Sequence, residues 1–113
     1  MIKTEESYSL FINTLAKLDE NKLALSDKEL NFEIFEELDS DHHTFLHSWT
    51  IDRLIAAGLV PKILRSRILA LRANISMTLK KSNSIDFYRN EKEWKVIRVE
   101  AHVLMSEIKA HSL

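Results

Sequence analysis

The sequence has no cysteine, and only one glycine and one proline among its 113 residues. Without cysteine the chain can form no disulfide, no thiolate zinc site and no cysteine nucleophile, and this absence fits a reducing cytoplasm. Glycine and proline supply most tight turns and average about 7% and 5% of residues in globular proteins. Their scarcity therefore predicts a mostly helical chain with few tight turns.

Long hydrophobic runs are missing as well. The apolar stretch LIAAGLV, residues 54–60, falls far short of the ~18 residues that a membrane-spanning helix needs. Glu5 and Glu6 interrupt the N-terminal stretch MIKTEESYSL, where a secretory signal needs an apolar core. A chain of 113 residues suits one domain. We therefore expect a single soluble, cytoplasmic domain over residues 1–113 with no membrane partner.

Apolar residues, which make up 45% of the chain, recur at helical spacings of three and four. This periodicity predicts an all-α, single-domain bundle of about five amphipathic helices, with paired helical hairpins of the solenoid type as the alternative. The expected helices cover 4–21, 26–38, 42–57, 61–81 and a last segment that begins at Asp86 or, if Asn90 and Glu93 form a capping box, at Asn90. Their apolar stripes are Tyr8, Phe11, Ile12, Leu15, Leu18, Leu30, Ile34, Leu38, Phe45, Leu46, Trp49, Leu54, Ile55, Leu64, Ile68, Leu71, Ile75, Leu79, Trp94, Ile97, Ala101, Leu104 and Ile108.

Residues at the expected helix ends support these bounds. Ser26 and Glu29 can form a capping box at the start of the second helix. The side chains of residues 39–41, Asp-Ser-Asp, compete with backbone hydrogen bonds and predict a break before the third helix. Gly58 suits the left-handed position after that helix, and Pro61 suits the first turn of the fourth.

The net charge is only −1, but its distribution along the chain is uneven. Residues 1–47 carry eleven acids against four lysines, a net of −7. Residues 48–113 carry twelve basic residues against six acids, a net of +6. Such asymmetry indicates either a charged partner or two halves that pack on each other.

Three histidines and two aspartates lie within DSDHHTFLHSW, residues 39–49. On a helix His43 and His47 would share a face, as in two-histidine metal sites, and Asp39 or Asp41 could add an oxygen ligand. The stretch lacks the acid of the HExxH metal motif, and no second cluster supplies further ligands. We therefore expect no metal and no cofactor, with His42 and His43 in a solvated first turn of the third helix and His47 at an interface. A histidine-dependent metal protein stays an alternative.

No motif for nucleophilic catalysis is present. None of Ser48, Ser66, Ser76 and Ser106 lies in a glycine-framed turn of the kind that exposes a catalytic serine. Catalytic groups generally lie on shaped loops, of which a chain this helical has few. We expect a protein that is not an enzyme.

A basic stretch, KILRSRILALR over residues 62–72, gathers Lys62, Arg65, Arg67 and Arg72. At 100° per residue Arg65 and Arg72 project together whereas Lys62 and Arg67 diverge, so the patch is diffuse. Its simplest interpretation is a solvated face that complements the acids of the second helix. The alternative function is a small helical nucleic-acid-binding regulator or adaptor that uses this basic stripe. Because the acidic half would repel phosphate, we expect no nucleic-acid partner.

The acidic run ELNFEIFEELDSDHH, residues 29–43, is the feature of the sequence that most suggests a binding surface. Like charges at these spacings destabilise an isolated helix by roughly 0.2–0.5 kcal/mol per pair. The run therefore indicates either a solvated face neutralised by the basic half or a docking surface for a cationic protein. Phe32 could provide an apolar anchor. The residues expected to contact the partner are Glu33, Glu36, Glu37, Asp39 and Asp41 as the electrostatic core, with His42, His43 and His47 as neighbouring hydrogen-bonding groups.

The stretch FLHSWTIDRLIAAGLVPKILRSRILALRANI, residues 45–75, within a small helical chain resembles the helical immunity proteins of bacterial contact-dependent growth inhibition systems. The resemblance implies a cytoplasmic, non-enzymatic protein, encoded beside a polymorphic toxin, that binds and neutralises the cognate toxin domain. Many such toxins are ribonucleases or DNases with basic clefts, so an acidic surface would occupy the cleft in place of nucleic acid. The resemblance transfers no individual residues.

Overall fold

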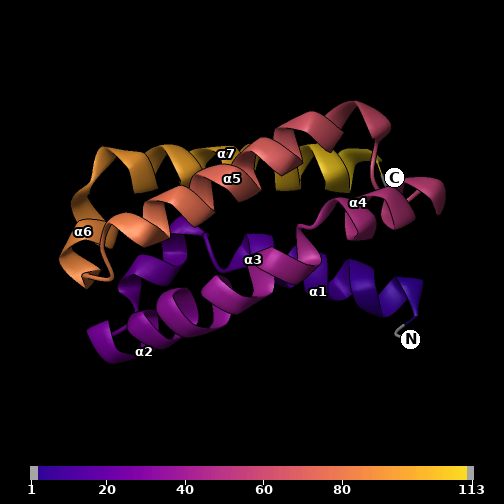
Figure 1. The fold of residues 1–113 in the computed structure, drawn as a ribbon. Coiled ribbons are helices and arrows are strands. Elements are labelled where there is room, and N and C mark those ends of the chain that lie inside the picture. Colours follow the sequence, from indigo (N-terminus) through magenta and orange to yellow (C-terminus); the bar gives the residue numbers. More distant parts are fainter. Residues whose placement is uncertain (1–2, 112–113) are drawn as a thin grey trace.

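The apolar stripes pack against one another in a bundle of α-helices, as a computed structural model that describes residues 3–111 shows (Figure 1). No strand occurs among these residues, so the prediction of an all-α fold is confirmed. The α-helices are α1 (Thr4–Ala16), α2 (Asp27–Asn31), α3 (Asp39–Phe45), α4 (Ser48–Ala56), α5 (Arg65–Lys81), α6 (Ile85–Asn90) and α7 (Lys92–His111). The other helical segments are the 3₁₀ turns η1 (Glu20–Ala24) and η3 (Lys62–Leu64) and the π-helix η2 (Phe32–Leu38).

The long helices form two walls of the bundle. In Figure 1, α5 and α7 lie side by side along one wall, and α1 and the run from α2 to α3 form the other. Contacts between the walls join α1 to α7 and α3 to α5, while α4 packs on α1. The short helix α6 connects α5 to α7 at the end opposite to α4. Residues 27–45 therefore run along the bundle with one face on the core and the other exposed.

The core forms where the predicted stripes meet. The buried residues of α7 include all five that its stripe predicted: Trp94, Ile97, Ala101, Leu104 and Ile108. The other stripe residues in the core are Phe11, Leu15, Leu18, Leu30, Ile34, Leu38, Leu46, Leu54, Leu64, Ile68, Leu71 and Ile75. Burying a Leu, Ile or Phe side chain contributes about 1.5–3 kcal/mol, so these faces decide how the helices pack. Within the described chain, no helix has the length and apolar character needed to span a bilayer.

The predicted break at residues 39–41 is wrong. The helix runs without interruption from Asp27 to Phe45 through the π-helix η2, and Asp39 has helical φ and ψ of −56° and −42°. Continuing the helix keeps Ile34 and Leu38 on the buried face. The Asp39 side chain is exposed, where water satisfies its carboxylate and removes the competition with the backbone.

This helix ends at Leu46 and His47 instead. Leu46 leaves the helical region with φ −105° and ψ 8°, and His47 is extended with φ −67° and ψ 148°. Nδ1 of His47 accepts a hydrogen bond from the backbone N–H of Trp49 at 3.1 Å and so caps α4. The Thr50 hydroxyl donates to the Thr44 carbonyl at 2.7 Å across the same turn. The third expected helix is therefore divided between α3 and α4.

Two helix ends agree with the sequence. The Ser26 hydroxyl accepts a hydrogen bond from the Glu29 backbone N–H at 3.2 Å, which starts α2. After α4, Gly58 has a φ of 77°, and the N–H of Leu59 donates to the Leu54 carbonyl at 2.9 Å. This is the Schellman arrangement, which needs a left-handed residue and favours glycine because glycine has no Cβ.

Asn90 and Glu93 do not form the capping box considered above. The Asn90 amide donates to the Asp86 carbonyl at 3.0 Å, and Glu93 accepts from Lys81 at 3.0 Å. Helices begin at both proposed places, because Ser84 caps α6 and a separate helix, α7, starts at Lys92.

The first helix is shorter than expected. It ends at Ala16 rather than near residue 21. Asp19 then accepts a hydrogen bond from the Asn21 N–H at 2.7 Å and starts the 3₁₀ turn η1. Here the Asp19 carboxylate does compete with the helix, because it accepts the hydrogen bond of the Asn21 N–H in place of a backbone carbonyl.

Candidate functional site

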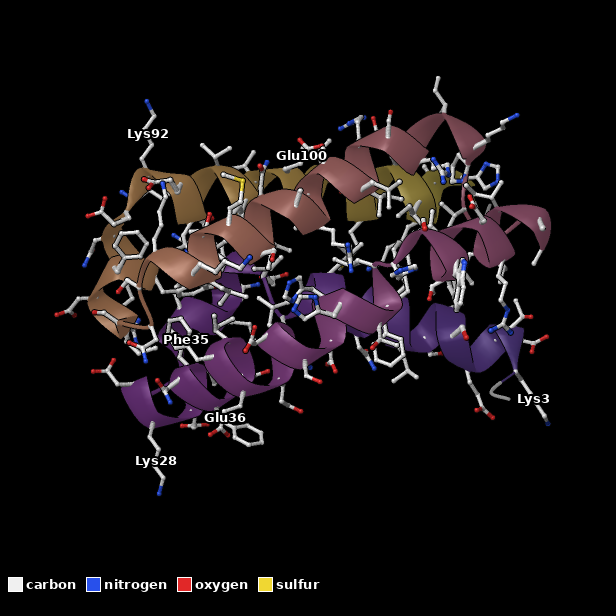
Figure 2. All side chains as sticks on the ribbon, viewed as in Figure 1. Lys3, Lys28, Phe35, Glu36, Lys92 and Glu100 are labelled. Carbon is white, nitrogen blue, oxygen red and sulfur yellow. The ribbon has the colours of Figure 1, made fainter. Side chains whose placement is uncertain are left out.

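The candidate docking surface lies on the continuous helix from Asp27 to Phe45. We call it the acidic surface, and it consists of Glu33, Glu36, Glu37, Asp39 and Asp41. Figure 2 shows Phe35 pointing toward the bundle and Glu36 pointing away from it. Phe35 packs edge-on against Tyr88 of α6 with ring centroids 6.5 Å apart. This contact fixes which side of the helix presents the acids.

Two lysines of the N-terminal half lie against part of the acidic surface. Nζ of Lys22 donates to Glu33 at 3.1 Å. Nζ of Lys17 lies 3.9 Å from the carboxylates of both Glu37 and Asp41. Ion pairs at a protein surface typically contribute 0–1 kcal/mol, and two lysines offset only part of the charge of five carboxylates.

Glu36 and Asp39 differ from the other three carboxylates. Both are exposed, and neither takes part in an ion pair with another residue of the range 3–111. The lysines that form ion pairs with the acidic surface, Lys17 and Lys22, both precede it in the chain. Within residues 3–111, no basic residue of the C-terminal half forms an ion pair with these five acids.

The basic stripe is paired with other acids. Nε and Nη2 of Arg65 donate to the two carboxylate oxygens of Asp52 on α4 at 2.7 and 3.3 Å. This hydrogen bonding raises the pKa of Arg65 and lowers the pKa of Asp52 relative to their ordinary values. Arg67 donates to Glu100 at 3.1 Å and to Glu107 at 2.8 Å, both on α7. Arg65 and Arg67 therefore pair with acids of α4 and α7, and not with the acids of the second helix as predicted.

Arg72 joins α5 to the end of α3. Its Nε and Nη2 donate to the backbone carbonyls of His42 and His43 at 3.2 and 3.3 Å. Carbonyls in the last turn of a helix lack an intrahelical partner and carry the negative end of the helix dipole. The guanidinium therefore stabilises the end of the helix that bears the acidic surface. Lys62, the remaining member of the basic stripe, is exposed.

His42 lies in the core, contrary to the prediction that it is solvated. Its side chain is fully buried, because the uninterrupted helix places it four residues after Leu38 on the buried face. Its Nδ1 lies 2.9 Å from the Leu38 carbonyl. A carbonyl oxygen can only accept, so Nδ1 of the neutral ring carries the proton.

His43 and His47 do not share a helical face, because the helix ends between them. His43 is exposed on α3, whereas His47 is half-buried at the start of α4. The ring of His47 meets that of Trp49 edge-on with centroids 5.5 Å apart, and its Nδ1 is occupied by the cap. The two-histidine pair suggested by the four-residue spacing therefore does not form.

Burial lowers the pKa of His42 below its ordinary value, because a charged ring loses its hydration in the core. The Leu38 carbonyl and Asp39 act in the opposite direction, while His43 and Arg72 add to the lowering by repelling a positive ring. Burial dominates. His42 is therefore neutral at neutral pH.

The lowered pKa of His42 makes the stability of the fold depend on pH. Above about pH 6.5 both the folded and the unfolded chain hold this ring neutral. As the pH falls below that value the unfolded chain binds a proton first, so we expect the free energy of unfolding to decrease by up to ~1.4 kcal/mol per pH unit until the folded pKa is reached. Urea denaturation between about pH 5 and 8 in metal-free buffer measures this slope.

The variant His42→Gln should lose this part of the pH dependence, because glutamine does not titrate. His102→Gln is the matched control, since His102 is exposed on α7. Identical slopes for the wild type and for His42→Gln would contradict the assignment.

Two exposed aromatic side chains lie before and after the acidic surface in the chain. Phe32, which was the expected anchor, is 52% exposed and lies four residues before Glu36. Trp49 is 80% exposed, so its predicted place in the core is wrong. The turn before α4 changes the helical register, and Ile51 and Leu54 form the buried face of α4 instead. Exposed tryptophan is enriched among residues that dominate binding energy, so Trp49 is a contact candidate that the stripe pattern missed.

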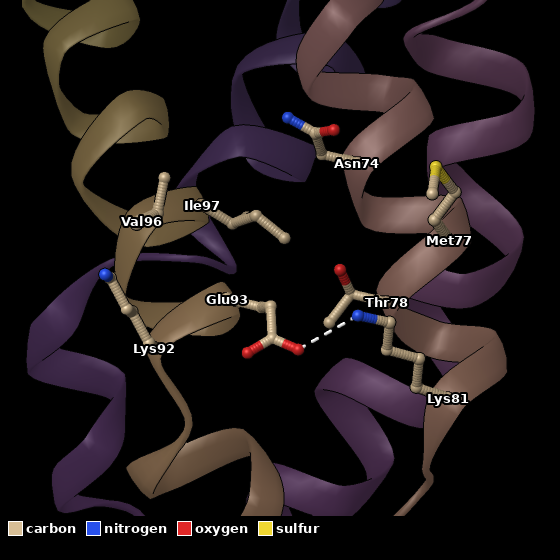
Figure 3. A pocket seen from close by; sticks show the side chains of 8 residues that line it. All are labelled: Asn74, Met77, Thr78, Lys81, Lys92, Glu93, Val96 and Ile97. Carbon is tan, nitrogen blue, oxygen red and sulfur yellow. Dashed lines mark hydrogen bonds and ion pairs between the residues drawn. The ribbon is translucent and has the colours of Figure 1, made fainter.

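A separate hollow of about 330 Å³ lies between α5 and α7 (Figure 3). Met77 and Val96 line it from the two helices and are 63% and 55% exposed. Nζ of Lys81 donates to Glu93 at 3.0 Å, and this hydrogen bond lowers the pKa of Glu93. The hollow joins residues from two helices, so no local sequence motif could have indicated it.

Comparison with protein-family models, curated proteins and solved structures found no match to this chain.

Proposed function

We propose that this chain is a cytoplasmic immunity protein, a non-enzymatic inhibitor that binds a cognate toxin domain and covers its basic active-site cleft. The observation that carries the proposal is the pair Glu36 and Asp39, exposed and without ion pairs in residues 3–111, on the outer side of one continuous helix. A nuclease presents lysine and arginine side chains to phosphate. Carboxylates held on a rigid helix can bind the same cations.

The lysine contacts of the acidic surface favour this role. Lys17 lies 3.9 Å from its two carboxylates, and Lys22 is partly exposed beside Glu33. Such surface pairs contribute little, so toxin cations can replace them at small cost. The charge would then steer association, which for complementary surfaces reaches 10⁸–10⁹ M⁻¹s⁻¹ at low salt.

The aromatic side chains would supply the part of the affinity that charge does not. Tight interfaces usually place an aromatic residue in a desolvated pocket, surrounded by polar contacts. Phe32 and Trp49 are exposed on either side of the acidic surface in the chain. His43 and His47 would add hydrogen bonds between them.

Charge reversal of the acidic surface tests the proposal. The double variant Glu36→Lys/Glu37→Lys should weaken binding to the toxin domain encoded beside this chain's gene by about 100-fold or more, because like charges brought together cost several kcal/mol. Its affinity should also depend less on salt. Isothermal titration calorimetry at two salt concentrations gives both quantities, and growth of toxin-expressing cells reports protection.

Glu5→Lys/Glu6→Lys is the matched control, because it changes the net charge equally at two exposed, adjacent glutamates on α1. It should bind and protect as the wild type does. Circular dichroism should show the same helical content in all three proteins. Unchanged affinity and protection after reversal at Glu36 and Glu37 would refute the proposed surface, and a neighbouring gene that encodes no secreted effector would count against the immunity role.

The alternative, a nucleic-acid-binding regulator, has less support. Arg65 and Arg67 already bind carboxylates, and Arg72 binds backbone carbonyls. A phosphate backbone would have to displace these partners before it gained a contact.

A further inference from the structure

Asp39, His42 and His43 bring three metal-ligating side chains together on α3. Each offers one ligand atom, a carboxylate oxygen or a ring nitrogen, and the three atoms all lie within 4.8 Å of one another. The cluster exists because the helix is not interrupted at residues 39–41. Residues three and four apart on a continuous helix are neighbours, so Asp39 faces both histidines.

The buried histidine has one nitrogen without a partner. Nδ1 of His42 bonds the Leu38 carbonyl, whereas Nε2 is buried and has no hydrogen-bond partner within residues 3–111. Roughly nine in ten buried polar groups have such a partner, so an orphaned one requires an explanation. A histidine that binds a metal usually donates its other ring N–H to a backbone carbonyl or a carboxylate, which holds the ring in place. His42 has this arrangement, with a free lone pair on Nε2.

The other two side chains can adjust. Asp39 and His43 are exposed, and the ring of His43 lies 4.0 Å from that of His42, centroid to centroid. Ligands held at 2.0–2.1 Å around a tetrahedral ion lie roughly 3.4 Å apart. Closing from 4.8 Å or less to that spacing needs rotamer changes of Asp39 and His43 while His42 stays fixed. Because Asp39 and His43 are exposed, water could supply a fourth ligand from their side.

Neighbouring charges determine which ions suit the cluster. Arg72 contacts the His42 and His43 carbonyls, and Lys80 lines the same hollow as Asp39 and His43. These cations oppose any metal, and the cluster itself contains only one carboxylate. Mg²⁺ and Ca²⁺ depend on several oxygen ligands, whereas Zn²⁺, Co²⁺ and Ni²⁺ bind neutral imidazole well. The cluster therefore suits an imidazole-binding ion of moderate affinity.

We propose that Asp39, His42 and His43 form a binding site for one divalent transition-metal ion of the zinc type. His42 supplies Nε2 as the fixed ligand, and the other two close on the ion from the surface. The site would fix the exposed ends of Asp39 and His43 within the acidic surface. It does not depend on the immunity role, because its ligands and its test are independent of any toxin.

Metal titration of the tag-free full chain tests the site. Co²⁺ should give visible d–d absorption that saturates at one ion per chain, and Zn²⁺ should displace it. His43→Ala and Asp39→Asn should each weaken Co²⁺ binding about tenfold or more, since loss even of an outer-shell partner changes metal affinity by 10–100-fold. Both changes are at exposed positions and should leave the fold intact. Mg²⁺ should not compete.

The remaining histidines provide the controls. His47→Ala and His102→Ala, at a half-buried and an exposed position outside the cluster, should retain wild-type Co²⁺ affinity. Equal affinity in His43→Ala and the wild type, or an equal loss in His102→Ala, would overturn the proposal and indicate nonspecific binding to surface histidines. Glu36→Lys/Glu37→Lys should still bind Co²⁺ with a clear tetrahedral spectrum, so failure of toxin binding and failure of metal binding are separable.

A stability measurement gives an independent readout. An ion that binds only the folded chain raises its melting temperature by mass action. Zn²⁺ should therefore raise the melting temperature of the wild type and of His102→Ala equally, and that of His43→Ala by less. No difference among the three proteins would count against a specific site.

Discussion

Replacing Trp94 by alanine is expected to lower the free energy of unfolding by about 3–5 kcal/mol. Trp94 is fully buried and packs on Tyr88 with ring centroids 4.8 Å apart. Its Nε1 has no hydrogen-bond partner within residues 3–111, so the loss comes from the cavity and the lost packing. Because the free energy of unfolding of small domains is typically 5–15 kcal/mol, this one change would remove a large part of the stability. Urea denaturation followed by circular dichroism measures it.

The second tryptophan is the matched control. Trp49 is 80% exposed on α4, and Trp49→Ala should change the free energy of unfolding by less than about 0.5 kcal/mol. A loss below about 1 kcal/mol in Trp94→Ala would show that α7 does not pack on the core as described.

Replacing Arg98 by alanine is expected to cost about 2–4 kcal/mol, because hydrogen bonds to charged groups contribute roughly 1.5–3 kcal/mol each. Arg98 is 4% exposed, and its Nη1 and Nη2 donate to the Tyr88 and Arg89 carbonyls at 2.7 and 3.4 Å. These carbonyls belong to the last turn of α6. The guanidinium also lies 4.9 Å from the centre of the Tyr88 ring, where a cation is attracted to the π-face. The same denaturation experiment applies.

Arg98→Met separates packing from hydrogen bonding. Methionine fills much of the volume of the arginine stem but donates no hydrogen bond, so its loss should lie between zero and that of Arg98→Ala. Lys95→Ala, at an exposed position of α7, should have little effect. A loss below about 1 kcal/mol in Arg98→Ala would mean that water replaces the guanidinium at the end of α6.

The sequence was most informative where one helical face is buried along its whole length. The stripe from Trp94 to Ile108 was predicted fully, because a burial period of 3.6 leaves a plain pattern when nothing interrupts the helix. Gly58 was also predicted correctly, since a positive φ strongly favours this residue. Both features depend on local chemistry alone.

Predictions that treated polarity as a helix breaker failed. Residues 39–41 were expected to interrupt the helix, but the Asp39 carboxylate is exposed and the Asp41 carboxylate lies 3.9 Å from Lys17. The expected break placed His42 in solvent, whereas Trp49 was placed in the core because the turn at Leu46 and His47 was not expected.

The partners of charged residues could not be read from the sequence. Arg67 lies 33 and 40 residues from Glu100 and Glu107, and Arg72 binds carbonyls rather than a side chain. Only the packing of α5 between α3 and α7 decides these pairings. The proposed function rests on Glu36 and Asp39, which form no ion pair within residues 3–111. This too depends on which lysines the fold brings close to the acidic surface, and the sequence does not show that.

The contrasting environments of Trp49 and Trp94 provide two optical reporters in one unlabelled chain. Trp94 is sealed from water, so its fluorescence should be blue-shifted and resistant to iodide quenching until the chain unfolds. Trp49 is open to solvent and touches the His47 ring. Its emission should therefore be red-shifted and should change when a partner covers the start of α4. A ligand docking there would alter one emitter and leave the other unchanged.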